Sequence, residues 1–281
     1  MDYGKSFTFV FDDPRWITKI AIGTGLILVS SLLSVILIGV LGFFILGGYS
    51  IRLLQNVRDG DDTPLPEWDD WGGDFMRGLK YAVVGIIWAL PMIIFVLPMI
   101  IGGAISDGNG GASFLGGLIM VGAGCLMFLY GLFVALAAPG FTIAYSGDER
   151  INSGLQFTEI WHWTQSNIGQ VIVAVLVVLL AQFVITMVGS IVGAVLCLVG
   201  MAITIPLASL AVSIFQHHVY GQLAHEFPFG GASALASNVP QELATTALSD
   251  MNLPAVAEDT AQTDVDDTDN STDTDSELPS A

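Results

Sequence analysis

Charged residues are scarce in this chain, and their absence is concentrated in long stretches. Asp, Glu, Lys and Arg make up 12% of the 281 residues, against about 25% in an ordinary globular domain. None of the four occurs in residues 20–51, 81–106, 108–147 or 160–225. A helix needs about 20 apolar residues to cross the hydrocarbon core of a bilayer, so each stretch can span a membrane at least once. This pattern excludes an ordinary water-soluble domain.

The same stretches lack the alternation of apolar and polar residues that a membrane barrel strand requires. The run VIVAVLVVLLAQFVITMV at 171–188 is apolar at nearly every position. Backbone groups in lipid must be hydrogen-bonded within the segment, which a single helix achieves and a single strand does not. We therefore expect an all-α fold, a polytopic integral membrane helical bundle.

Cysteine is also rare: Cys125 and Cys197 are the two in the chain, and both lie inside apolar runs. A disulfide framework or a zinc site needs more ligands at regular spacing, so we expect no cofactor and no metal. The N-terminal apolar run is far longer than the roughly 7–15 residues of a cleavable signal core, and we expect it to be retained.

Basic residues are few, with 8 Lys and Arg against 26 Asp and Glu and a net charge of −18. Such a surface repels the phosphate backbone of nucleic acid, so we expect no nucleic-acid partner. At molar salt the Debye length falls to about 3 Å, and a very acidic surface then carries little self-repulsion. We interpret the composition as that of a salt-loving organism; an acidic tail on an ordinary membrane protein is the alternative.

The chain contains three similar units, each an acidic, tryptophan-bearing segment followed by apolar sequence. FDDPRW at 11–16, PEWDDW at 66–71 and FTEIWHW at 157–163 begin these units. If each apolar unit is a helical hairpin, all eight bases fall on one side, which the positive-inside rule makes cytoplasmic. We therefore expect six spans in the cell membrane, with both the N-terminus and the C-terminal tail in the cytoplasm. Five spans is the alternative, because the break expected near 30–34 contains no Gly or Pro.

Composition also divides the chain into two parts. Residues 1–229 form the expected transmembrane helical domain, with interfacial segments at 5–19, 49–80 and 148–167. Residues 230–281 are the expected tail, which is rich in Asp and Thr and has ten acids and no base from Asp250 onward. With almost no large apolar side chains, the tail cannot bury enough surface to fold. We therefore expect it to be disordered.

Tryptophans gather in the three interfacial segments. Because tryptophan favours the headgroup level of a bilayer, five of them are candidate interfacial anchors: Trp16, Trp68, Trp71, Trp161 and Trp163. Trp68 and Trp71 would share one face of a short surface helix. Asp69, Asp70 and Asp74 fall largely off that face, and we expect them to point toward water. A chemical site is the alternative for this segment, although residues 49–80 contain no histidine.

Polar groups are sparse within the apolar runs. The last run carries a candidate polar stripe of Ser209, Ser213, Gln216 and His217, which favours hydrogen bonding between helices. His218 and His225 share a helical face, but they make a poor zinc set. GSIVG at 189–193 matches the G-x-x-x-G dimer pattern, yet we expect it to fall at the turn between two spans. Because no nucleophile–base pair or metal cluster is visible, no catalytic residue is predicted.

Residues 48–91, GYSIRLLQNVRDGDDTPLPEWDDWGGDFMRGLKYAVVGIIWALP, resemble the signature of an archaeal membrane family known as domain of unknown function 4013. A Gly-Tyr pair leaves the first apolar run, an Arg-bearing helix follows, and Pro-Glu-x-Asp-Asp-Trp precedes the next span. YGQLAHE at 220–226 also fits, so the resemblance covers roughly residues 5–227. It implies membrane placement and an archaeal source, and it supplies no catalytic residue.

Two functions remain open. The first is a non-catalytic membrane scaffold or partner-anchoring subunit, which the lipid bilayer surrounds and which binds an unidentified membrane protein or another copy of itself. The second is a transporter-like conduit or binder for a small or lipidic solute. The few polar groups in the spans favour the first, while the prolines at 91 and 98 and the polar stripe motivate the second. We do not expect an enzyme.

Overall fold

The computed structural model describes residues 1–107 and 110–230, and these residues form helices and short connections without a β-strand. In chain order the elements are α1 (Lys5–Thr8), η1 (Phe9–Asp12), α2 (Trp16–Leu33), η2 (Ser34–Ile36), α3 (Val40–Asp59), α4 (Trp71–Ser106), α5 (Gly111–Asp148), η3 (Ser153–Leu155), α6 (Phe157–Ser166), α7 (Ile168–Val195) and α8 (Cys197–Glu226). Six of these helices are long and apolar enough to cross a membrane. The expected all-α membrane bundle is confirmed, with six candidate spans rather than five. The predicted tail beyond residue 230 lies outside the described residues.

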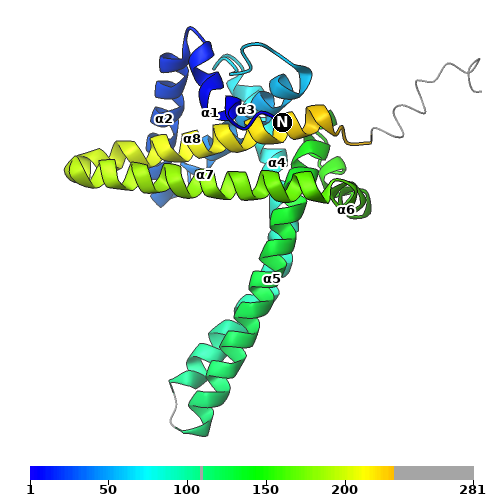
Figure 1. The fold of residues 1–281 in the computed structure, drawn as a ribbon. Helices are drawn as coiled ribbons and strands as arrows, with labels where there is room; N and C mark the ends of the chain where they lie inside the picture. The colour runs from blue at the N-terminus through cyan, green and yellow to red at the C-terminus, as the bar shows by residue number, and fades with distance from the viewer. Residues whose placement is uncertain (108–109, 231–281) are drawn as a thin grey trace, which may run out of the picture. The chain divides into compact units, whose positions relative to one another are not determined.

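Consecutive long helices pair as the hairpin prediction requires. Helix α2 packs against α3, α4 against α5, and α7 against α8, and the last two pairs run side by side along their lengths in Figure 1. Helix α3 also packs against both α4 and α8. It therefore joins the three hairpins, and Ile51, Leu53 and Leu54 on α3 each belong to a different buried apolar cluster.

The first hairpin turns slightly later than expected. The predicted break lay near 30–34, but α2 continues to Leu33 and the chain reverses over residues 34–39. Leu37 adopts the left-handed conformation at φ 63°, and Gly39 follows where a Cβ atom would lie 1.9 Å from the carbonyl oxygen of Ser30. Gly39, the glycine that permits the turn, thus lies outside residues 30–34, where the break was predicted.

The GSIVG segment does not form a turn, contrary to the prediction. Helix α7 continues through it to Val195, and the chain reverses at Leu196. A Cβ atom on Gly189 would lie 2.9 Å from the Cβ of Ala208, and one on Gly193 would lie 2.4 Å from Oγ1 of Thr204. Both glycines therefore allow α7 and α8 to approach closely within one chain, which is the role that small residues play between membrane helices.

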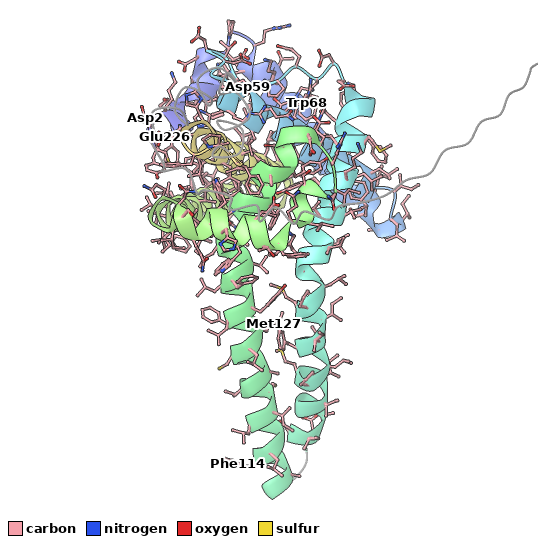
Figure 2. The ribbon with its side chains drawn as sticks, turned by 90° about the vertical axis from the view of Figure 1, so that its right-hand side faces the viewer. Asp2, Asp59, Trp68, Phe114, Met127 and Glu226 are labelled. Atoms are coloured by element: carbon pink, nitrogen blue, oxygen red, sulfur yellow. The ribbon has the colours of Figure 1, made fainter. Side chains whose placement is uncertain are left out.

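The ends of α4 and α5 nearest their connection form an arm, which we define as residues 90–107 and 110–130. It projects away from the other helices in Figure 1, and Figure 2 shows Phe114 and Met127 along it. Its apolar side chains are widely exposed, with Ile94 at 66%, Phe114 at 73% and Phe128 at 72%. Helices of 36 and 38 residues are about 54–57 Å long, well beyond the roughly 30 Å of a hydrocarbon core.

Replacing Gly193 by Leu should destabilise the α7–α8 pair, because the side chain would have to displace Thr204. Overpacking of a tight contact costs about 1–3 kcal/mol, and thermal unfolding of the detergent-solubilised chain should report a lower midpoint. Gly169→Leu on the same helix is the matched control, since nothing lies within 4 Å of a Cβ there. Equal midpoints for the two variants would contradict the close packing.

Candidate functional site

The three predicted interfacial segments meet in one layer of charged side chains. We call this group the charged layer; its members are Asp13, Arg15, Lys19, Arg52, Glu67, Asp69, Asp74, Arg77 and Glu149. The members come from segments far apart in the chain, before and at the start of α2, along α3, around the start of α4 and after α5. Ion pairs between these segments hold together the ends of four spans.

One half of the charged layer is centred on Lys19, in the second turn of α2. Its ammonium donates to the carboxylate of Asp13, and lies 2.7 Å from the carbonyl oxygen of Leu65 and 2.6 Å from Oε1 of Glu67. Arg15 reaches the same Glu67 oxygen at 2.6 Å. Lys19 and Asp13 are both 5% exposed at their side chains, so the N-terminal segment is locked onto the connection between α3 and α4.

Burial alone would raise the pKa of Asp13, but its partners outweigh that effect. Hydrogen bonds from the Lys19 ammonium and the Arg15 backbone N–H, together with the two positive charges, hold the pKa below its ordinary value. The carboxylate is therefore ionised at neutral pH. It acts as a fixed counter-charge rather than as a proton donor.

The other half of the charged layer is centred on Asp74, whose side chain is almost fully buried. Arg52 from α3 donates to Oδ2 of Asp74 at 2.8 Å, and Arg77 from α4 donates to Oδ1 at 2.7 Å. Arg52 also reaches Asp69 at 3.0 Å and the carbonyl of Glu67 at 2.6 Å. A carboxylate held by two guanidinium groups is well paired, and such a buried group becomes costly when one partner is lost.

Arg77 extends this network to the end of α5. Its Nε donates to Oε1 of Glu149 at 2.7 Å, and Gln55 of α3 donates to the same oxygen at 3.1 Å. Glu149 ends α5 in the left-handed conformation at φ 56°. Desolvation acts to raise the pKa of Glu149, yet the Arg77 and Gln55 contacts leave it lowered. Helices α3, α4 and α5 are thus joined through one network of charged and polar side chains.

Tight helix contact places Asp74 in this position. A Cβ atom on Gly48 of α3 would lie 1.9 Å from the carbonyl oxygen of Asp74, and one on Gly78 would lie 1.7 Å from the carbonyl oxygen of Phe44. Because the two backbones nearly touch, Asp74 cannot reach water and needs internal partners. The expectation that Asp74 points toward water is therefore wrong. The glycines at 48 and 78 are the feature of the sequence that could have indicated this close helix contact, although the sequence does not show that they face each other.

Trp68 and Trp71, in the predicted interfacial segment 49–80, do not lie on a short surface helix of their own. Trp68 precedes α4 and Trp71 begins it, with their rings 5.5 Å apart. Asp70 caps the helix by accepting from the backbone N–H of Gly73 at 3.0 Å. Trp71 is 43% exposed and is thus open to solvent or lipid.

Two of the predicted anchors make specific internal contacts. Trp68 stacks on Tyr49 with ring centroids 3.9 Å apart, and its indole N–H donates to the carbonyl of Lys19 at 2.9 Å. Trp163 is buried and donates to the carbonyl of Phe227 at 3.1 Å. Each therefore ties elements of the chain together, and a role at the headgroups stays a prediction.

Trp16 and Trp161 are half-buried. Trp16, the first residue of α2, meets Phe11 edge-on at 5.0 Å. Trp161 on α6 lies beside Phe133 of α5 at the same ring separation. For these two, as for Trp71, anchoring in the interface remains a prediction.

The predicted polar stripe on α8 separates into groups with different surroundings. Ser213 lies 2.9 Å from Ser50 of α3, oxygen to oxygen. Ser209 is exposed and donates to the carbonyl of Ile205, and Gln216 is half-buried. His217 is buried with Nδ1 2.8 Å from the carbonyl of Ser213, while its Nε2 atom has no partner among the described residues. The four side chains do not line one shared cavity.

The other histidines of α8 fasten neighbouring segments. Nδ1 of His218 lies 2.9 Å from the hydroxyl oxygen of Ser6, and Nδ1 of His225 lies 2.6 Å from the carbonyl of Arg58. The terminal ammonium of Met1 pairs with Glu226. The end of α8 therefore holds both the N-terminal segment and the end of α3.

Asp74→Asn should destabilise the chain severely, because the partly buried Arg52 and Arg77 would each lose a charged partner that is itself fully buried. Breaking a buried ion pair on one side costs about 3–5 kcal/mol, and thermal unfolding in detergent should show it as a lower midpoint and a reduced yield. Asp62→Asn, in the exposed connection before α4, is the matched control and should unfold like the unmodified chain. Equal stability of both variants would contradict the structural role of Asp74.

The comparisons with known proteins add a family. The sequence matches the family described as "Protein of unknown function (DUF4013)" over residues 29–194, more than half of the chain. That range includes most of the charged layer, three of the six candidate spans in full and all but the last residue of a fourth. Neither the curated proteins nor the solved structures contain a match. The chain belongs to the DUF4013 family.

Proposed function

We propose that this chain is a non-catalytic membrane protein that anchors or organises a partner in the cell membrane. The observation that carries the proposal is that the ionisable side chains of the charged layer are paired with one another and join helices. Its buried carboxylates, Asp13 and Asp74, are each held by basic side chains. A general acid or base needs a tuned, accessible group near a reacting atom, whereas these groups are fixed in ion pairs that join helices.

The arm supplies the surface for such a partner. Its exposed side chains are almost all apolar, including Ile94, Leu118 and Phe128. Between helices in lipid, association depends on close packing rather than on the hydrophobic effect. The arm also carries glycines that face open space, at 117 and 124, so another helix can approach its backbone. The partner is an unidentified membrane protein or a second copy of this chain.

We propose further that both ends of the chain lie in the cytoplasm. In Figure 2, Asp59 and Trp68 lie at the end of the described structure opposite to Phe114 at the tip of the arm. Arg58 pairs with Asp59, and Arg15 and Arg52 pair with Glu67 and Asp69 on either side of Trp68 in the chain. The positive-inside rule places that end in the cytoplasm. The charge balance of 26 acids to 8 bases supports a salt-loving, archaeal source.

The runner-up is a conduit or binder for a small or lipidic solute. It is supported by Ser209, which is exposed and lines a small hollow of about 50 Å³ together with Thr186 and Ser190. Pockets that bind small molecules usually measure about 300–1,000 Å³, so this hollow is small for such a solute. In a conduit, the ion pairs of the charged layer would only hold the helices together and would not contact the solute. We therefore favour partner anchoring.

The test is purification of the tagged full chain from its native membranes at high salt, followed by mass spectrometry of co-eluting proteins and lipids. We expect a stoichiometric protein partner or a second copy, which should be lost from the arm variant Leu118→Ala/Phe128→Ala. The matched control is Leu176→Ala/Phe183→Ala on α7, where both residues are equally apolar and exposed, and it should keep the partner.

Two results would contradict the proposal. A chain that elutes alone and monomeric, with unchanged thermal stability in both variants, would remove the anchoring role. A small solute bound in equal amount to the chain, without any protein partner, would favour the conduit instead.

A further inference from the structure

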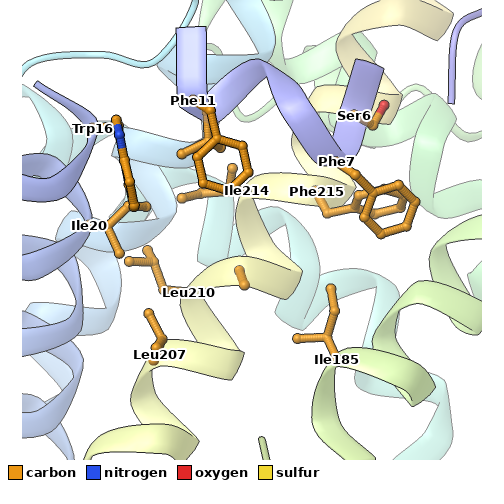
Figure 3. Close-up of a pocket in the computed structure, with 12 residues that line it drawn as sticks. Ser6, Phe7, Phe11, Trp16, Ile20, Ile185, Leu207, Leu210, Ile214 and Phe215 are labelled. Atoms are coloured by element: carbon orange, nitrogen blue, oxygen red, sulfur yellow. The ribbon is translucent and has the colours of Figure 1, made fainter. Parts of the chain in front are cut away.

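An apolar groove of about 280 Å³ lies where the N-terminal segment crosses the bundle. Figure 3 shows Phe11, Trp16 and Ile20 along one side, with Leu210 and Ile214 of α8 opposite and Ile185 of α7 at the far end. Three of the elements that form it, α2, α7 and α8, are candidate spans. The groove is therefore lined by the N-terminal segment before Trp16 and by parts of three candidate membrane-crossing helices.

The groove offers almost nothing that could hydrogen-bond to a polar occupant. Ser6 and the indole of Trp16 are the polar side chains among its lining residues, and the Ser6 hydroxyl is already engaged with His218 at 2.9 Å. Water does not stably fill an apolar cavity. The apolar walls of the groove therefore favour a hydrocarbon chain as its occupant.

The size of the groove excludes a helix as its occupant. A helix with its side chains is about 10–12 Å across, and each turn of it would need far more room than about 280 Å³. One slender hydrocarbon chain fits such a volume. A second copy of this chain or a partner helix can at most cover the opening.

One exposed cationic side chain is the sequence neighbour of a residue that lines the groove. Arg15 immediately precedes Trp16, and its side chain is 69% exposed. Among the described residues its side chain pairs with Glu67, and Lys19 holds the same Glu67 oxygen at 2.6 Å. Arg15 can therefore turn to another anion without leaving Glu67 unpaired. In Figure 3 the ring nitrogen of Trp16 is turned away from Leu207 and Leu210.

We propose that this groove binds one hydrocarbon chain of an anionic glycerophospholipid, whose phosphate is held by Arg15 and the indole N–H of Trp16. Guanidinium groups bind phosphate through paired, charge-assisted hydrogen bonds. Tryptophan at the headgroup level supplies one donor. The site is independent of the proposed partner on the arm, and it makes a bound lipid part of the contact between the N-terminal segment and α8.

The experiment is native mass spectrometry of the purified full chain, delipidated and then titrated with phosphatidylglycerol or phosphatidylcholine. We expect one retained phosphatidylglycerol per chain, bound about tenfold more tightly than phosphatidylcholine, as one charge-assisted contact would give. Arg15→Gln should abolish the preference between the two lipids while it leaves retention of phosphatidylcholine unchanged.

Ala211→Trp fills the groove and should prevent retention of either lipid. Ala202→Trp, at an exposed position on the same helix, is the matched control and should behave like the unmodified chain. If Ala211→Trp fails to fold, Leu207→Phe narrows the groove at a half-exposed position and should weaken retention.

The proposal is overturned if Ala211→Trp and Leu207→Phe retain phosphatidylglycerol like the control, or if Arg15→Gln keeps the preference. These outcomes are separate from the test of partner anchoring. Loss of a protein partner from the arm variant leaves the lipid in the groove, and loss of the lipid leaves the arm intact.

Discussion

The carboxylate of Asp74, held between Arg52 and Arg77, is the contact on which the rest of the bundle depends. It is buried because α3 and α4 cross at Gly48 and Gly78, where no side chain fits between the backbones. Burial of a charge is tolerated when it is fully paired and hydrogen-bonded. The two arginines that satisfy it also reach outward, to the connection before α4 and to the end of α5. The crossing of two helices thus determines where four spans and their connections meet.

Much of the architecture could be predicted from where charge is missing. Gaps in charge indicate spans because an ion in lipid is costly, and the three units of apolar sequence correspond to the three observed hairpins. The turns were harder to predict. GSIVG and the 34–39 turn both contain glycine, and a glycine that permits a turn looks the same in sequence as one that permits close packing. The sequence does not show which of the two a given glycine serves.

The charged layer was only partly predictable. The three segments were identified as neighbours of the membrane surface, and Asp74 and Arg77 are close enough in sequence to pair on one helix. The partnership of Asp74 with Arg52, across 22 residues of sequence, depends on how α3 and α4 cross. For the same reason the stack of Trp68 on Tyr49 was not foreseen. Composition indicates that an aromatic ring belongs near the headgroups, but it does not indicate which rings face inward.

The described part of the molecule has a fixed end and open apolar surfaces. At the charged layer, the side chains are committed to each other and hold the hairpins in register. Along the arm and the groove, apolar side chains remain uncovered among the described residues. We therefore infer that the choice of binding partner depends on the shape and packing of these apolar surfaces within lipid. The ionisable groups contribute the rigidity that keeps the surfaces in place.

The most direct measurement of this account is the sidedness of single cysteines, introduced after Cys125 and Cys197 have been replaced by alanine. Asp62→Cys and Asn152→Cys lie in connections at the charged layer, and Ala112→Cys lies at the tip of the arm. A membrane-impermeant maleimide applied to intact cells should label Ala112→Cys alone, and inverted vesicles should give the opposite pattern. Labelling of Asp62→Cys and Asn152→Cys from different sides of the membrane would contradict the three hairpins and the shared layer that joins them.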